Sequence, residues 1–339
     1  MKRPKHLVFL LIMLIVVLSA CKRNPLKVDI SDIQSEAEIV PFGELLFNIE
    51  EGDTLEAIAK LSNEYPDFFN LFTYRIIRIG GIGDQDFPEL MKTFLADTLI
   101  QEVKVKTDSV FNNPKKLDKQ LVKAFKYFAW HFPDKEIPTI YTYISGFNQS
   151  IVTAENLVGI SLDKYLGRDC KYYQQLNTTP QYKIQNMHKD RIVPEVAYAW
   201  ALTEFEDPNS ATNLLDHIVQ KGKLMYLVDA MLPDTPDSLK IGYSTEQLNW
   251  CQMNEVPMWT YLIEHKMLYS NKRMDIVRYV NDAPTTSGFP LESPGRTGVW
   301  IGWQIVRQYM KEHPEVTLEE LMNNKEYQQI LNESEYDPG

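Results

Sequence analysis

Two histidines and a glutamate in the middle of this 339-residue chain, His188, Glu195 and His217, have the side chains best suited to chemistry. Two imidazoles and a carboxylate can bind a divalent metal ion, and Glu195 is the only candidate for a catalytic carboxylate. His188 precedes the helix expected to carry Glu195, and the spacing does not bring the three side chains together. These three residues support one alternative to a non-catalytic function, namely an envelope metallohydrolase or peptidase with non-standard metal ligands.

The residues around Glu195 do not complete the zinc-binding helix of HExxH peptidases. In that motif two histidines four residues apart bind the metal, and the glutamate between them polarises the bound water. Here Pro194 and Tyr198 occupy the two histidine positions, and Lys221 precedes Gly222 where a third, glutamate ligand would stand. Proline has no donor atom, and an ammonium group repels a cation. We therefore expect no metal, no cofactor and no catalysis.

Two pairs of carboxylates, Glu195 with Glu204 and Glu255 with Glu264, are candidates for glycoside hydrolysis. The chain has 46 acidic residues, so such pairs arise freely on solvated helix faces. We prefer that interpretation to a catalytic one.

The N-terminus has the pattern of a lipoprotein signal peptide. Lys2 and Arg3 precede an apolar run from Leu7 to Leu18, and Leu18-Ser19-Ala20-Cys21 is a lipobox. The run is much shorter than the roughly twenty residues that span a bilayer. We expect residues 1–20 to be removed, Cys21 to carry a diacylglyceryl thioether and an N-acyl chain such as palmitate, residues 21–36 to form a flexible tether, and residues 37–339 to form one large domain.

The net charge limits the classes of binding partner, and the two cysteines other than Cys21 bear on the cellular compartment. The formal net charge is −11, which argues against a nucleic-acid-binding face. Cys170 and Cys251 could pair in an oxidising periplasm or remain two buried thiols, and the sequence leaves both open. No aspartate follows Cys21 directly, which favours the periplasmic leaflet of the outer membrane.

The elements that must position Glu195 are mostly helices. Apolar periodicity predicts helices over residues 54–64, 87–95, 116–132, 191–205, 210–231 and 245–269, and one from residue 296 or 297 to 312. A capping box at Thr317 opens a short final helix. Alternating β-branched and aromatic residues predict strands over residues 137–145 and 156–162, with an extended entry over 39–47. Gly80-Gly81-Ile82-Gly83 is expected to be a turn.

Two further patterns concern packing. Gly298 and Gly302, four residues apart, indicate a helix lying close against another backbone. The Trp and Met-rich stripe Trp250, Met253, Met258, Trp259, Leu262, Ile263 and Met267 is expected to be core, as are Trp300 and Trp303.

Several segments resemble the gliding motility lipoprotein GldB family along nearly the whole chain. They are the lipobox, residues 159–167, Ile192-Val193-Pro194-Glu195, Glu246-Gln247-Leu248-Asn249-Trp250, the block from Ser293 to Arg307, and residues 330–336. The family is similar to zinc-dependent peptidases of the zincin type, with a degenerate metal motif here.

The resemblance implies a predominantly helical α+β fold with a degenerate zincin-like core and a small β-sheet. It also implies a non-catalytic lipoprotein that binds other envelope proteins of the gliding and secretion machinery. We expect a groove edged by Leu157, Val158, Gly159 and Ile160 and floored by Glu195, which would hold an extended peptide by strand addition.

Overall fold

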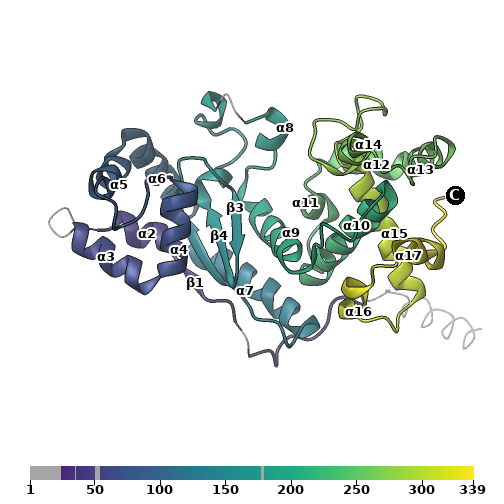
Figure 1. Cartoon of the computed structure of the whole chain (residues 1–339), viewed down its shortest axis with the longest axis horizontal. Helices are drawn as coiled ribbons and strands as arrows, with labels where there is room; N and C mark the ends of the chain where they lie inside the picture. Colours follow the sequence, from purple (N-terminus) through teal and green to yellow (C-terminus); the bar gives the residue numbers. More distant parts are fainter. Residues whose placement is uncertain (1–23, 35, 50–53, 177–178) are drawn as a thin grey trace, which may run out of the picture.

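The computed structural model describes residues 24–34, 36–49, 54–176 and 179–339. Helices surround a small mixed sheet, which confirms the predicted α+β fold with a predominance of helix (Figure 1). The predicted signal peptide and the lipid-modified Cys21 lie outside the described residues.

The helices fall into two groups separated in sequence by residues 139–161, a segment that contains three of the four strands of the sheet. Those before it are α2 (Phe42–Phe47), α3 (Thr54–Glu64), α4 (Pro66–Asn70), the π-helical segment η1 (Leu71–Ile76), α5 (Phe87–Ala96), α6 (Thr98–Val110) and α7 (Pro114–His131). Those after it are α8 (Gln181–Ile184), α9 (Ile192–Phe205), α10 (Leu214–Met231), α11 (Asp237–Ile241), α12 (Thr245–Met253), α13 (Glu255–Glu264), α14 (Arg273–Val280), α15 (Thr297–Glu312), α16 (Leu318–Asn323) and α17 (Tyr327–Ser334).

The sheet has the strand order β1-β2-β4-β3, with β1 (Ile39–Val40), β2 (Thr139–Tyr143), β3 (Ile151–Ala154) and β4 (Leu157–Ser161). The pairs β1 with β2 and β2 with β4 are parallel, and β3 runs antiparallel to β4. All five residues of β4 are buried, as expected for an apolar strand covered on both faces.

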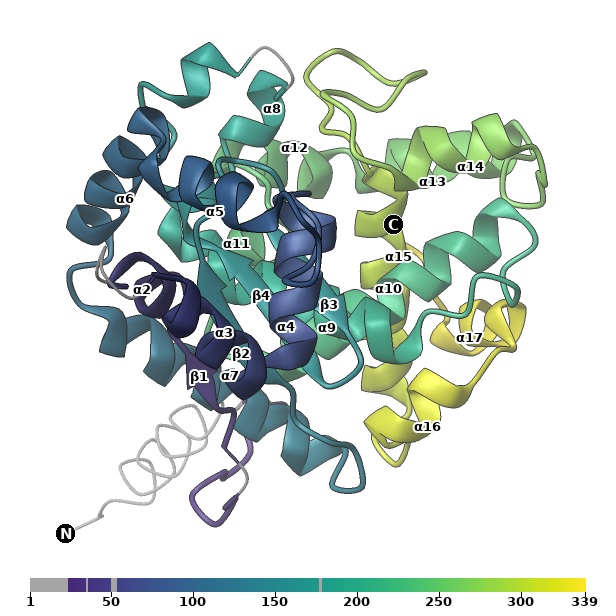
Figure 2. The same cartoon turned by 60° about the vertical axis from the view of Figure 1, so that its left-hand side comes forward.

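The alternation of side chains along the strands divides the interior into a core on each face of the sheet. Tyr141 and Tyr143 face a core formed with α2 to α5, where the Phe68 ring stacks on Tyr141 with centroids 4.2 Å apart. Figure 2 shows these helices in front of the sheet. Ile140 and Val158 face the larger core, which includes residues of α7, α9, α10 and α15. Helix α9, with Glu195, therefore packs on the sheet from the second side.

Helices α10 and α15 approach so closely that only glycine fits at their crossing. A Cβ atom on Gly222 would lie 2.1 Å from the carbonyl oxygen of Gly302, and one on Gly302 would lie 1.9 Å from that of Ile218. A Cβ atom on Gly298 would lie 2.9 Å from the oxygen of Tyr279. The predicted close contact of the Gly298–Gly302 helix with another backbone is confirmed.

The segment expected to be a flexible tether lies against the folded domain. We call residues 24–34 the strap. Asn24 Nδ2 donates to the Pro233 oxygen at 3.1 Å, and Lys27 Nζ is 2.7 Å from Asp234 Oδ1. Leu26 packs against the larger core. The strap crosses the bottom of the molecule in Figure 1 before the chain enters β1.

Most predicted helices and strands are present, and the differences have local causes. The helix predicted over 245–269 is two helices, because α12 ends at Met253 and Asn254 begins a new one. In the predicted core stripe, Met258 and Leu262 are buried, but Met253 is 82% exposed, so the stripe is only partly core. Residues 42–47 form helix α2 rather than extended chain. The turn expected within residues 80–83 lies at Ile82 and Gly83, and the capping box at Thr317 is confirmed. The helix that this box opens, α16, is not the final one, because α17 follows it.

None of the helices in the described part of the chain has the length and apolar character needed to cross a membrane.

Candidate functional site

Glu195 lies in the first turn of α9, and both of its carboxylate oxygens are occupied. The Tyr165 hydroxyl donates to Oε2, and Arg191 Nη2 donates to Oε1 at 3.3 Å. The Glu195 side chain is 26% exposed and that of Arg191 is 7% exposed. The carboxylate is therefore held by a guanidinium and a phenol at the edge of the protein interior.

Arg191 is fixed by backbone groups of the segment that follows α10. Its Nη1 donates to the carbonyl oxygens of Leu239 and Lys240, the latter at 3.2 Å. Gly242 has a left-handed backbone, and a Cβ atom there would lie 2.9 Å from Arg191 Nη2. Burial lowers the pKa of Arg191, and the charge of Glu195 opposes this effect. The ion pair with Glu195 thus compensates a charge that lies inside the protein.

Further cationic groups surround the same carboxylate. Arg296 lies at the start of α15 with a left-handed backbone (φ 60°), and its Nε is 3.1 Å from Asp282 Oδ1. Burial lowers the pKa of Arg296, but neighbouring charges, Asp282 foremost and Glu195 among them, outweigh it and raise the pKa. Burial lowers the pKa of Lys164, against the charges of Asp163 and Glu195. Glu195 therefore lies in a cationic environment, which disfavours a metal ion.

The positions that replace zinc ligands do not fit a metal. Pro194 is buried, and Tyr198 is half-buried with its pKa raised by burial. Lys221 Nζ donates to Glu206 Oε1, so an ammonium–carboxylate pair stands at the position expected for the third ligand. No three His, Cys, Asp or Glu side chains of the described residues are grouped as they would be around a metal ion.

The structure does not bring His188, Glu195 and His217 together. Burial lowers the pKa of His188, on which the charges of Asp190 and Glu195 also act. Burial lowers the pKa of His217 too, but the charges that act there are those of Lys221, Asp216 and Glu206. His188 therefore lies near Glu195, whereas His217 lies near the ion pair of Lys221 with Glu206.

The carboxylate pairs also fail as catalytic pairs. Glu195 and Glu204 are nine residues apart on α9, as are Glu255 and Glu264 on α13, which separates each pair by about 13 Å along the helix axis. That is more than the roughly 5 to 9.5 Å between glycosidase carboxylates. Glu204 Oε2 instead binds Lys135 Nζ at 2.7 Å, and Glu255 accepts from the Tyr336 hydroxyl at 2.7 Å.

The groove predicted along Leu157, Val158, Gly159 and Ile160 is wrong. These residues form β4, which pairs with β2 on one side and with β3 on the other. Their backbone groups are already bonded, so no peptide can add to this strand, and β3 is the outer strand instead. The error arose because the short strand β3 was not predicted.

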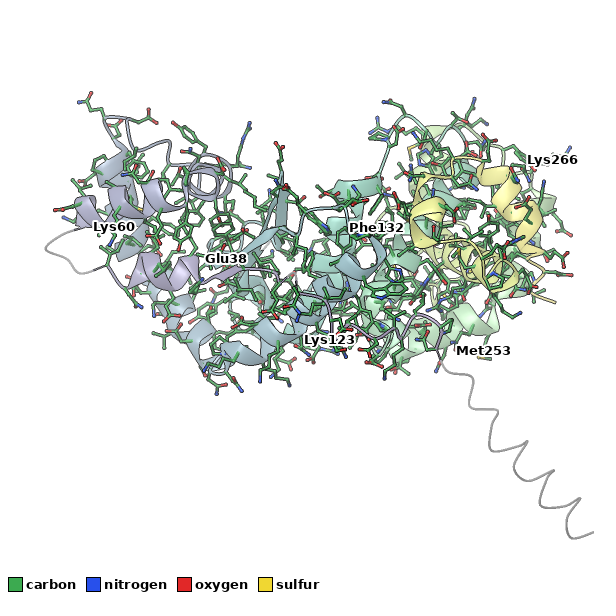
Figure 3. The ribbon with its side chains drawn as sticks, turned by 90° about the horizontal axis from the view of Figure 1, so that it is seen from below. Glu38, Lys60, Lys123, Phe132, Met253 and Lys266 are labelled. Atoms are coloured by element: carbon green, nitrogen blue, oxygen red, sulfur yellow. The ribbon has the colours of Figure 1, made fainter. Side chains whose placement is uncertain are left out.

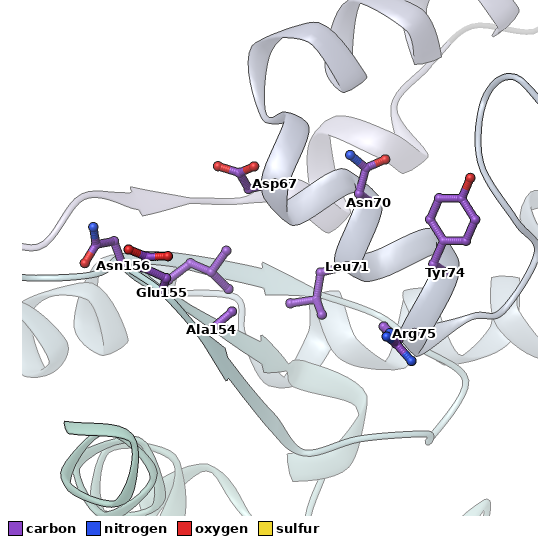
Figure 4. A pocket seen from close by; sticks show the side chains of 9 residues that line it. Asp67, Asn70, Leu71, Tyr74, Arg75, Ala154, Glu155 and Asn156 are labelled. Atoms are coloured by element: carbon purple, nitrogen blue, oxygen red, sulfur yellow. The ribbon is translucent and has the colours of Figure 1, made fainter. Parts of the chain in front are cut away.

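A cavity of about 770 Å³ opens between the α4–η1 segment and the turn from β3 to β4 (Figure 4). Of the four predicted groove residues in β4, only Leu157 lines it. The side chains of Asp67, Arg75 and Glu155 also line it, and they form no hydrogen bond or ion pair with another described residue. We call this the hairpin cavity. Glu155 follows the unpredicted strand β3, so no sequence pattern pointed to it as a site residue.

A second cavity, of about 1070 Å³, lies between the strap and the segment that joins α15 to α16. Its lining includes a charge network that joins α10, α11 and α15. Asp229 accepts from Lys240 Nζ and from Trp303 Nε1, each at 2.7 Å, and Arg307 binds both Asp229 and Asp237. Because Asp229 and Lys240 are buried, the removal of either side chain would leave the other charge uncompensated inside the protein.

The sequence allows the proximity of some residues to Glu195 to be predicted, but not that of others. Arg191 precedes Glu195 by four residues at the start of a predicted helix, a spacing that places the two side chains on one helix face. Tyr165 and Arg296 reach Glu195 only through the tertiary fold.

The fold and the site define a mostly helical α+β protein whose central glutamate is engaged by an arginine and a tyrosine. The family model described as gliding motility protein GldB matches residues 23–338, and the chain belongs to this family. No curated protein and no solved structure matches it. Family membership makes the protein a lipoprotein of the gliding motility machinery in the cell envelope.

Proposed function

We propose that this protein is a non-catalytic component of the gliding motility machinery and its associated secretion pathway, and that it acts by binding other envelope proteins. Lipid on Cys21 would hold it at the periplasmic face of the outer membrane. The observation that carries the proposal is the occupation of both Glu195 oxygens by Arg191 and Tyr165. Each oxygen keeps a further acceptor position, but no group of metal-binding side chains among the described residues stands beside it to hold a metal ion that would activate a water molecule.

The order of elements supports a degenerate zincin-like core. An antiparallel outer strand, β3, is followed by the buried strand β4 and then by α9, with its glutamate in the first turn. In a zinc peptidase the same helix would supply histidines beside this glutamate. Here Pro194 and Tyr198 stand in their place, which supports descent from a peptidase without its reaction.

The hairpin cavity is the site where a partner protein would bind. It is open at the surface, and Asp67, Arg75 and Glu155 offer charges of both signs without described partners. Such groups can pair with opposite charges of a partner without the loss of an internal ion pair, and complementary charges fix the register of an interface.

The proposal is tested by complementation in a gliding bacterium that lacks its own copy of the gene. A chain with Glu195→Gln keeps a polar group beside Arg191 and Tyr165 but cannot act as a general base. We expect it to restore spreading and adhesin secretion as well as the unchanged chain. Loss of both with normal protein levels, together with chelator-sensitive peptidase activity of the unchanged purified protein, would establish the metallohydrolase alternative instead.

A second pair of variants tests the binding site. Arg75→Glu with Glu155→Lys reverses two charges of the hairpin cavity while preserving their sum, and Lys60→Glu with Glu64→Lys does the same on nearby α3. We expect only the first pair to abolish gliding. Equal activity of the two double variants would remove the hairpin cavity from the proposal.

A further inference from the structure

Helix α7 carries an unusual concentration of positive charge. Its 18 residues include five lysines and one aspartate, in a chain whose formal net charge is −11. Lys115, Lys119, Lys123 and Lys126 follow one another at intervals of three or four residues, so they share one face of the helix. Lys116 flanks this face, and Trp130, 45% exposed, continues it at the C-terminal end.

The opposite face of α7 is apolar and buried, so this orientation is fixed. Leu121, Phe125 and Phe128 are each 0% exposed within the larger core. The lysine face must therefore point outward, and Lys123 is 53% exposed. Figure 3, which shows the molecule from below, places Lys123 on the side along which the strap runs.

The strap and α7 are joined through one carboxylate. Asp234 binds Lys27 of the strap at 2.7 Å and Lys123 of α7 at 3.0 Å, and Lys126 binds Glu36 at 2.7 Å. Lys115, Lys116 and Lys119 form no ion pair with any residue that the structure describes. The lysine face thus retains positive charge after these internal pairs and the acidic neighbour Asp118 are counted.

The length of chain between the anchor and the strap limits how far this face can be from a membrane. Cys21 precedes Asn24 by three residues, which can span at most about 11 Å. Asn24 is itself bonded to Pro233, beside Asp234. A lipid on Cys21 therefore keeps the strap and the adjoining end of α7 close to the bilayer surface.

We propose that the lysine face of α7, together with Trp130, is a second membrane contact, which binds anionic phospholipid headgroups and fixes the orientation of the lipid-anchored domain. Each lysine near an anionic surface adds attraction that salt weakens, and tryptophan favours the headgroup region. One lipid anchor leaves a domain free to rotate. The second contact holds the strap side toward the membrane and the α5 side away from it.

The inference rests on the anchoring at Cys21 in the proposed function, and its experiment uses the full lipid-modified chain reconstituted into vesicles. A fluorophore is attached at Gln120→Cys on α7 or at Thr93→Cys on α5, both exposed positions. The native Cys170 and Cys251 are buried, so the new cysteine is labelled selectively. The vesicles contain phosphatidylcholine alone or with phosphatidylglycerol, and a headgroup nitroxide serves as the quencher.

We expect strong quenching at position 120 only with phosphatidylglycerol and at low salt, and little quenching at position 93. Replacing Lys115, Lys116 and Lys119 with glutamine should lower the ratio of docked to free domain about 100-fold. Glutamine has a helix propensity close to that of lysine, so the fold is kept. The matched control replaces Lys60, Lys92 and Lys106, exposed lysines of α3, α5 and α6, and should change nothing.

Equal quenching at the two positions, or unchanged quenching in the α7 triple variant, would overturn the inference. Mass spectrometry of the N-terminal peptide distinguishes the absence of an α7 membrane contact from the absence of a lipid anchor on Cys21. A peptide without lipid on Cys21 would contradict the anchoring itself, whereas a lipidated chain with equal quenching would contradict only the α7 contact.

Discussion

Arg191 and Glu195 are one helical turn apart, and Arg191 Nη2 lies 3.3 Å from Glu195 Oε1. The arginine is the more buried partner, and it also binds two backbone carbonyl oxygens after α10. We expect Arg191→Met to lower the free energy of unfolding by about 3 kcal/mol, since the carbonyls and the carboxylate lose their donor. Glu195→Gln should cost less, about 2 kcal/mol, because it removes the charge that compensates the buried Arg191 but keeps an acceptor oxygen. Urea unfolding measures both, and equal midpoints would contradict the assigned geometry.

The crossing of α10 and α15 gives a second prediction. In Gly302→Ala the added methyl group would meet the Ile218 carbonyl oxygen, which belongs to a helix backbone and cannot rotate away. We expect a loss of about 3 kcal/mol or more in thermal or urea unfolding. Gly83→Ala is the control, because nothing lies within 4 Å of a Cβ atom there. Its stability should change by less than about 1 kcal/mol, and a similar loss in both variants would contradict the close crossing.

His131, the last residue of α7, gives a pH-dependent prediction. Burial lowers its pKa from 6.5 to about 4, so the folded protein excludes a proton that the unfolded chain binds. The contribution of neutral His131 to the free energy of unfolding is fully present above pH 6.5 and is lost as the pH falls toward 4. At pH 5 this loss amounts to about 2 kcal/mol. His131→Leu should therefore lose less stability between pH 7 and pH 5 than the unchanged chain. His188 and His217 change in the same direction in both proteins, so the difference between the two urea midpoints is the measurement. Parallel curves would contradict the assignment.

The two cysteines described by the structure are free and buried, Cys170 in a small core with Phe147 and Tyr173, and Cys251 in the larger core. Of the two alternatives that the sequence left open, a disulfide or two buried thiols, the structure has the two thiols. Burial raises the pKa of the Cys251 thiol, which further suppresses the reactive thiolate. We expect neither to react with iodoacetamide in the native protein and both to react in urea. A non-reducing digest that contains a Cys170–Cys251 disulfide peptide would show the placement to be wrong.

The sequence predicted well the elements whose pattern is long and repeated. Helix α3 has the bounds predicted for it, and α9 and α15 begin and end within a residue of prediction, because their apolar periodicity and flanking residues are local signals. Strand β3 has only four residues, all half-buried, so it offers no strong alternation. Missing it placed β4 at the edge of the sheet and made the predicted groove wrong.

At the candidate site, only relationships between residues of the same helix could be predicted from the sequence. The absence of zinc ligands at Pro194, Tyr198 and Lys221 could be read from spacing, since all three positions depend on local helical periodicity. Tyr165, which binds Glu195, is 30 positions away from it in the sequence, and Arg296, whose charge interacts with that of Glu195, is about 100 positions away. No periodic pattern links such distant residues, so the cationic surroundings emerge only when β4, α9 and α15 pack together.

The strap also determines which contacts of the domain would bear a pulling force first. A pull applied at Cys21 first reaches the contacts of Asn24 with Pro233 and of Lys27 with Asp234, beyond the C-terminal end of α10. Only after these contacts open would tension reach β1, whose two residues pair with β2 at the other edge of the sheet from β3. With a lipid anchor on Cys21, the contacts of the strap would therefore break before force on the anchor reached this short strand.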